Sequence, residues 1–222
     1  MKTKGIKNLI SGIVFIIAFM IWTILILILD VQPIGVKGTN IGFATINSWF
    51  HSLTGVNMTL YTITDWLGLV PIFICMIFGL VGLIQLIKRK NLLKVDFDII
   101  ILGVYYVIVV LCYLIFEMIP INYRPVFING FMEASYPSST TLLVLGVMPT
   151  LVFQAKRRIK SNKIKKIICV ITILFSAFMV VGRLVSGVHW ITDIVGSVLL
   201  SMGLFHVYKG VVLWNLMKNF KV

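Results

Sequence analysis

Six stretches of this chain are long and apolar enough, or nearly so, to cross a lipid bilayer. They run approximately over residues 9–29, 67–87, 97–119, 140–154, 167–185 and 189–208, and the fourth is the shortest. A helix needs about 20 apolar residues to cross a hydrocarbon core about 30 Å thick. Lipid offers no partner to backbone polar groups, so each stretch is confined to a helix. The sequence therefore predicts an all-α integral membrane protein, a six-helix bundle forming a single domain over residues 1–222.

The composition agrees with a membrane location. Hydrophobic residues make up 59% of the chain and charged residues 12%, whereas soluble domains usually carry about 25% charge. This excludes a disordered chain, a collagen-like fibre and an ordinary soluble globule. The first apolar stretch follows three lysines, as a signal peptide would, but its apolar core is too long and no small-residue cleavage site follows it. We therefore expect a retained first span.

The basic residues predict the orientation. Of the 20 Lys and Arg, all but Lys37, Arg124 and Arg183 fall on one side of the six predicted spans. That side carries Lys2, Lys4, Lys7, Lys88, Arg89, Lys90, Lys94, Lys156, Arg157, Arg158, Lys160, Lys163, Lys165, Lys166, Lys209, Lys218 and Lys221. Cytoplasmic loops are enriched in Lys and Arg, so both termini are expected in the cytoplasm. The basic residues behind the net charge of +13 then orient the protein and contact anionic lipid head groups. We expect no nucleic-acid partner, because the sequence shows no nucleic-acid-binding module.

The outer segment from about residue 33 to 61 carries an amphipathic pattern. Apolar residues recur at helical spacing in Phe43, Ile46, Trp49, Phe50, Leu53 and Val56, and polar residues fill the other face in Thr45, Asn47, Ser48, His51 and Ser52. The pattern predicts a helix lying in the outer interface, with Trp49, Tyr61 and Trp66 in the aromatic belt. His51 and His206 are interpreted as interfacial side chains. The cysteines, Cys75, Cys112 and Cys169, indicate buried thiols, without a disulfide framework or metal site.

Polar residues gather in three segments at the outward ends of the spans, where polar groups near lipid usually mark function. The segments are residues 117–125, 136–140 and 182–193. His189 and Asp193 are four residues apart at a helix start and so share a face. A carboxylate there can fix the imidazole tautomer and leave the other ring nitrogen free as a nucleophile or base.

The same segments supply groups that bind phosphate. Arg183 precedes a flexible turn at Ser186 and Gly187, and its guanidinium can hold two phosphate oxygens at once. Arg124, in a loop constrained by the following proline, offers a second such fork. Ser138 and Ser139, with backbone N–H groups at a helix start, add neutral donors. Together these residues predict a phosphoryl-transfer site.

These segments resemble the signature of the type-2 phosphatidic acid phosphatase and vanadium haloperoxidase superfamily. That signature reads Lys-x6-Arg-Pro, Pro-Ser-Gly-His and Ser-Arg-x5-His-x3-Asp, and the resemblance covers roughly residues 60–208. It implies six transmembrane helices, with Arg124, Ser138 and Arg183 gripping phosphate. It further implies that His189 attacks phosphorus to form a phosphohistidine, that Asp193 orients His189, and that the reaction needs no metal or other cofactor.

The chain departs from the signature at four positions. Glu117 stands at the Lys position, Ser139 and Thr140 at the Gly and His positions, and Gly182 at the Ser position. In the family that His protonates the leaving group, which Thr140 cannot do well, and a missing acid costs about 10²–10⁴-fold in rate. An ionised Glu117 would repel a phosphate, whereas a protonated Glu117 could serve as the acid.

Three interpretations remain open at this point. The first is a phosphatase whose acid is Glu117, Glu133 or a bound water. The second is a lipid pyrophosphatase, whose phosphate leaving group needs less protonation than an alkoxide. The third is a non-hydrolytic binder or transporter of lipid phosphates that keeps the phosphate cradle. We expect a hydrolase acting on a lipid phosphate or lipid pyrophosphate at the outer leaflet of the plasma membrane, with membrane lipids as its surroundings.

Overall fold

The computed structural model describes the backbone of residues 2–218 and the side chains of residues 3–215. Lys221 and the side chains of Lys2 and Lys218, which belong to the basic set above, lie outside this part. Within it, the secondary structure consists of helices and three isolated β-bridges. The helices are α1 (Lys2–Ile28), η1 (Val36–Gly38), α2 (Ala44–Thr54), α3 (Met58–Leu67), α4 (Leu69–Arg89), η2 (Leu92–Lys94), α5 (Phe97–Met118), α6 (Ser139–Arg158), α7 (Asn162–Val185) and α8 (Ile191–Lys218).

Six segments are long and apolar enough to span a membrane, which confirms the predicted all-α, six-span architecture. They are Thr3–Ile28, Met58–Arg89, Phe97–Met118, Ser139–Arg158, Asn162–Val185 and Ile191–Asn215. The second begins earlier than predicted because α3 runs directly into α4 at Gly68. The side chain of Asn57 starts α3 by accepting a hydrogen bond from the Leu60 N–H at 2.9 Å, the usual role of an N-cap residue.

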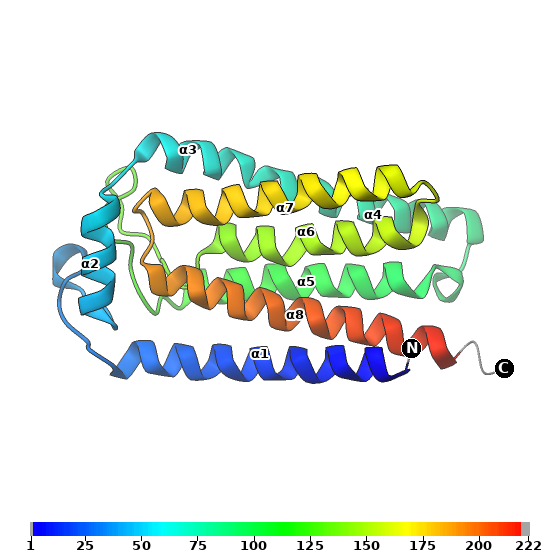
Figure 1. The fold of residues 1–222 in the computed structure, drawn as a ribbon, viewed down its shortest axis with the longest axis horizontal. Coiled ribbons are helices and arrows are strands. Elements are labelled where there is room, and N and C mark those ends of the chain that lie inside the picture. Colours follow the sequence, from blue (N-terminus) through cyan, green and yellow to red (C-terminus); the bar gives the residue numbers. More distant parts are fainter. Residues whose placement is uncertain (1, 219–222) are drawn as a thin grey trace.

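The fourth span, α6, lies in the middle of the bundle and packs against α4, α5, α7 and α8 (Figure 1). Its central position explains why its sequence is the least apolar of the six, since its polar side chains meet protein rather than lipid. Thr150 is hydrogen-bonded to the hydroxyl of Tyr106 at 2.7 Å, and Gln154 donates to the hydroxyl of Tyr208 at 2.8 Å. Because these buried polar groups are hydrogen-bonded, their burial costs little free energy.

Helix α1 packs along α8 in the opposite direction, and glycines bring the two backbones close (Figure 1). A Cβ on Gly12 of α1 would lie 2.7 Å from Val207 Cγ2 and 2.8 Å from the Val207 backbone nitrogen. A Cβ on Gly203 of α8 would lie 2.7 Å from Ile16 Cγ1. Small residues at helix contacts allow this close approach in membranes.

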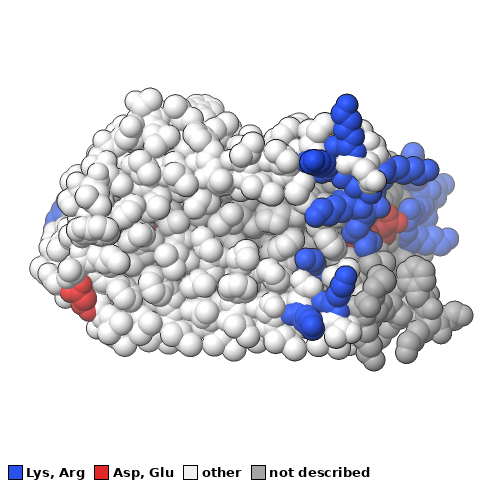
Figure 2. All heavy atoms as spheres, viewed as in Figure 1, with Lys and Arg blue, Asp and Glu red and all other residues white. Residues whose placement is uncertain are grey.

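The two ends of the bundle differ in charge. Figure 2 shows Lys and Arg gathered at the end that holds the start of α1 and the end of α8, with few charges on the rest of this face. We call this the basic end. There, the buried carboxylate of Asp98 on α5 pairs with Arg157 and Arg158 of α6 at 3.3 Å and 2.9 Å. The opposite end is covered by α2 and by the segment between α5 and α6 (Figure 1).

Helix α2 is the amphipathic segment expected in the outer interface, although it is shorter than the segment 33–61. Its apolar side chains Ile46, Trp49 and Leu53 are exposed, as they would be against lipid. Its buried residues are Ala44 and Asn47, and Asn47 donates to the Gly42 carbonyl at 2.8 Å and to Thr192 Oγ1 at 3.1 Å. The helix is therefore attached to the start of α8 through a buried amide.

Candidate active site

The three polar segments of the sequence meet at the end of the bundle opposite the basic end. The connection between α5 and α6 folds back on itself through a β-bridge between Tyr123 and Ala134, and the Arg124 N–H donates to the Glu133 carbonyl at 3.1 Å. The turn between α7 and α8 carries His189. Gly187 allows this turn, since its φ is +66° and a Cβ there would lie 1.7 Å from the Gly55 carbonyl oxygen.

His189 and Asp193 are buried side by side, with 3% and 0% of their surface exposed. The nearest approach, from His189 Nδ1 to Asp193 Oδ2, is 3.7 Å, which is too long for a hydrogen bond. The hydroxyl of Ser135 lies between them, 3.1 Å from His189 Nδ1 and 2.5 Å from Asp193 Oδ2. The Trp190 N–H also donates to that carboxylate oxygen, at 2.9 Å.

The tautomer of His189 follows from the hydrogens that Ser135 can share. The Ser135 hydroxyl carries one hydrogen, which the carboxylate of Asp193 accepts when it is ionised. Towards His189 the same oxygen can therefore only accept, which places the ring hydrogen on Nδ1. In the neutral ring, Nε2 then has a free lone pair, and this atom is buried without a hydrogen-bond partner among the described residues.

Two arginines from different segments lie next to the ring of Tyr61 on α3. Arg183, on the last turn of α7, is 1% exposed and places its Cζ 4.8 Å from the ring centroid, and the Cζ of Arg124 lies 5.6 Å from it. Arg183 Nη2 pairs with Asp65 at 3.4 Å, and Arg124 Nη2 pairs with Glu133 at 3.1 Å. Cations over an aromatic face are stabilised by the ring quadrupole.

These pairings leave part of each guanidinium group unused. Arg124 Nη1 and Arg183 Nε are buried without a partner in the described part of the chain, as is His189 Nε2. A buried N–H group without an acceptor costs about 1–3 kcal/mol. An anion with several oxygens would accept from both of these donors, and the free lone pair of His189 Nε2 belongs to the same end of the bundle.

The pKa of His189 reports the same surroundings. Burial is the largest cause and lowers the pKa of the ring well below its usual value; the charges of Arg124 and Arg183 lower it further. Both arginines therefore act on the ring electrostatically. The ring is neutral at physiological pH, the form in which a histidine can act as a nucleophile or base.

The second segment lies beside this group at the start of α6. The Ser138 hydroxyl donates to Thr141 at 3.1 Å, and the Ser138 N–H donates to the Asp193 carbonyl at 3.3 Å, so both donors of Ser138 are already used. Ser139 and Thr140 instead line a cavity of about 410 Å³ between the start of α4, α5 and α6. Its wall also includes Asp65, and its other lining is mainly apolar, with Leu69, Ile72, Val109, Val110, Leu142 and Leu143.

The two glutamates in this region lie differently. Glu133 is ion-paired with Arg124. Glu117 is exposed at the end of α5 and lines a small pocket with Tyr136 and Ser139. Glu117 has no ion-pair partner among the described residues. In the described part of the chain, no group of three or more His, Cys, Asp or Glu side chains is placed to hold a metal ion, and the three cysteines are free.

Sequence reasoning missed Ser135, Tyr61 and Asp65. Tyr61 was expected in the aromatic belt, yet its ring contacts both arginines. Their spacing shows only that Tyr61 and Asp65, four residues apart, share a face of α3; it does not show which helix that face meets. The departure at Gly182 belongs to the same arrangement, since a Cβ there would lie 2.7 Å from Thr64 Cγ2. Gly182 lets α7 approach α3, which brings Arg183 to Tyr61 and Asp65.

The fold and site define an integral membrane helical bundle with a buried His–Asp pair and two arginines at one end. The sequence model of the PAP2 superfamily matches residues 101–217, and the chain belongs to this superfamily, as its motifs predicted. A solved structure, the "first transmembrane PAP2 type phosphatidylglycerolphosphate phosphatase from Bacillus subtilis", superposes with a TM-score of 0.62 at 17% identity, covering 90% of this chain and 95% of that one. A comparison with curated proteins gives no match.

Proposed function

We propose that this protein is a membrane phosphatase that hydrolyses the phosphate or pyrophosphate head of a lipid through a phosphohistidine intermediate. One observation carries the proposal: Arg124 Nη1, Arg183 Nε and His189 Nε2 are buried, unpartnered and gathered at one end of the bundle. Membership of the PAP2 superfamily supports the same reaction class.

In the proposed reaction, the lone pair of His189 Nε2 forms a bond to phosphorus while the bond from phosphorus to the leaving oxygen breaks. Arg124 and Arg183 stabilise the charge on the remaining phosphate oxygens. His189 becomes positively charged, and Asp193 offsets that charge through Ser135. Water then attacks phosphorus and the N–P bond breaks. Inorganic phosphate is released, a proton passes to solvent, and His189 returns to its neutral form.

The leaving group is where this site departs from the family pattern. Thr140 cannot protonate an alkoxide, and Glu133 is already ion-paired with Arg124. A lipid diphosphate avoids the problem, because the group that leaves is itself a phosphate. We therefore propose a lipid diphosphate as the preferred substrate, with Glu117 or a water molecule as the acid for monophosphates.

The cavity lined by Thr140 and Asp65 is the proposed route for the lipid tail. It adjoins the polar group through Asp65, the ion-pair partner of Arg183. The proposed entrance therefore lies between α4, α5 and α6. We further propose that the basic end faces the cytoplasm, so that both termini are cytoplasmic and His189 faces the outer leaflet of the plasma membrane.

The deciding experiment measures phosphate release by the purified protein from a lipid monophosphate and a lipid diphosphate of equal chain length. Wild type is expected to prefer the diphosphate, and His189→Ala to release none. Labelled substrate should leave an acid-labile phosphate on the wild-type chain and not on His189→Ala. Equal release by wild type and His189→Ala would disprove the mechanism.

Two further variants separate the alternatives. Thr140→His faces the cavity and should raise monophosphate turnover selectively by supplying the acid. The remaining alternative is a non-hydrolytic lipid-phosphate binder or transporter. Binding of lipid phosphate without turnover by wild type, abolished by Arg183→Ala, would establish that alternative instead.

A further inference from the structure

A second large cavity opens in the half of the bundle nearest the basic end. Its volume is about 580 Å³, and it lies between α6, α7 and α8. Its apolar lining includes Leu145, Pro149, Phe153, Ile173, Phe205 and Leu213. Thr172, Ser176 and Cys169 are the less apolar parts of the wall. We call this the α6–α8 groove.

The groove has the depth of one lipid acyl chain. Its lining on α6 runs from Leu145 to Arg157, which is about 18 Å at 1.5 Å per residue. Half of a hydrocarbon core about 30 Å thick is about 15 Å. The groove therefore reaches from near the middle of the membrane to the surface of one leaflet, with its apolar part inside and its charges at the mouth.

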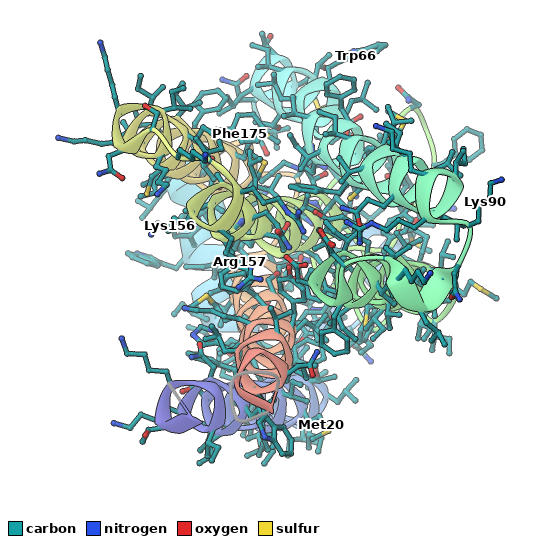
Figure 3. The ribbon with its side chains drawn as sticks, turned by 90° about the vertical axis from the view of Figure 1, so that its right-hand side faces the viewer. Met20, Trp66, Lys90, Lys156, Arg157 and Phe175 are labelled. Carbon is teal, nitrogen blue, oxygen red and sulfur yellow. The ribbon has the colours of Figure 1, made fainter. Side chains whose placement is uncertain are left out.

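The charges at the mouth are all positive. Lys156 and Arg157 come from α6 and Lys209 from α8. Arg157 is held by Asp98 at 3.3 Å, whereas Lys156 and Lys209 have no carboxylate partner among the described residues. Figure 3, which looks onto the basic end, shows Lys156 and Arg157 near one another and well away from Lys90.

We propose that the α6–α8 groove binds an anionic phospholipid of the leaflet at the basic end. One acyl chain lies along the groove, and the lipid phosphate sits between Lys156 and Lys209. Basic pockets between membrane helices bind anionic head groups in this way, each Lys near the surface contributing about 1 kcal/mol. A zwitterionic lipid is disfavoured because it brings its own cation to the two lysines.

This site is separate from the proposed phosphatase site and does not depend on it. The lipid would link α6 to α8, and the same two helices carry Ser138 and Asp193 at their other ends. The test uses phosphatidylglycerol, whose single phosphate is a diester, so that hydrolysis of a phosphate monoester at His189 does not interfere.

Lipid binding to the full-length protein in detergent is measured by native mass spectrometry, with phosphatidylglycerol and phosphatidylcholine of equal chain length. Wild type should retain phosphatidylglycerol selectively. Lys156→Gln/Lys209→Gln should bind it about 30-fold more weakly, since two lysines contribute about 2 kcal/mol and 1.4 kcal/mol is tenfold. Ile173→Trp, which fills the apolar part, should also weaken binding.

The matched control is Lys88→Gln/Lys90→Gln, which removes the same charge at the same end but outside the groove. It should bind phosphatidylglycerol like wild type. The proposal is wrong if wild type retains both lipids equally, if Lys156→Gln/Lys209→Gln has no effect, or if the control pair loses as much binding. The last result would mean that the basic end attracts anionic lipid through its overall charge.

Discussion

At the scale of single residues, one hydroxyl group joins the two members of the buried His–Asp pair. Ser135 bridges a gap of 3.7 Å between His189 Nδ1 and Asp193 Oδ2 that the two side chains do not close alone. When Asp193 is ionised, Ser135 donates to the carboxylate and accepts from the ring, which holds the hydrogen on Nδ1. The proposed nucleophile Nε2 is thus oriented by a residue outside the Pro-Ser-Ser-Thr segment from which the second motif was read.

Ser135→Ala should lower kcat on a lipid diphosphate by about 10–100-fold. A hydrogen bond to a charged group contributes about 1.5–3 kcal/mol, and 1.4 kcal/mol is a factor of ten in rate. Ser135→Thr, which keeps the hydroxyl, is the control and should retain most of the activity. A kcat for Ser135→Ala within twofold of wild type would show that the bridge has no role in the reaction.

His189 should stay neutral at pH values where an ordinary histidine is protonated. Burial, followed by Arg124 and Arg183, lowers its pKa, so a proton binds the unfolded chain first as the pH falls through about 6.5. Acidification should therefore lower the free energy of unfolding. Ring NMR signals, assigned with His189→Asn, should report a neutral ring with hydrogen on Nδ1 at pH 6.5. Half-protonation at or above that pH would contradict the expectation.

The sequence anticipated part of this site. Arg124, Arg183, His189 and Asp193 were grouped from motif spacing, and the structure places them at one end of the bundle. Tyr61 and Asp65 could not be grouped with them, because nothing in the sequence says which face of α3 meets α7. That contact depends on the shape of the helix surfaces, through Gly182 and Thr64.

At the scale of helices, close approach of the backbones holds the helices together, a role that burial of bulky apolar side chains has in soluble proteins. Lipid tails are as apolar as leucine, so helices associate in membranes through tight contact rather than through burial of apolar surface from water. In α1 and α8 this contact passes through Gly12 and Gly203. The spans were predictable from length and hydropathy, whereas the pairing of the first with the last was not.

Gly12→Ala should destabilise the protein, because its Cβ would overlap both the backbone and the side chain of Val207. Overpacking of this kind costs about 1–3 kcal/mol. Thermal unfolding in detergent should show a lower Tm for this variant. Gly79→Ala in α4 is the matched control, since a Cβ there meets no atom within 4 Å. Equal Tm values for the two variants would mean that the close contact between α1 and α8 at Gly12 does not contribute to thermal stability.

At the scale of the whole molecule, the two ends of the bundle carry different groups. Lysines and arginines gather at the basic end, and the buried His–Asp pair lies at the other. The proposed reaction and the proposed lipid site therefore lie in different leaflets. The orientation of the chain therefore determines which leaflet supplies the lipids for each site.

Cysteine labelling tests the orientation in a variant without Cys75, Cys112 and Cys169. An impermeant thiol reagent added to intact cells should label Lys37→Cys, which is exposed near α2. It should label Lys163→Cys, at the start of α7, only after permeabilisation. The opposite labelling pattern would place the basic end outside and would overturn the proposed topology.

The class of protein, the six spans, the gathering of basic residues at one end and the four residues of the first and third motifs could all be predicted from the sequence. These properties follow from hydropathy, charge and spacing, which are local and can be read along the chain. The three-dimensional arrangement was needed to find that Ser135 bridges His189 and Asp193, that Tyr61 contacts both arginines, and that α6, α7 and α8 leave a groove. Those contacts join residues far apart in sequence, and they depend on how helix surfaces fit together.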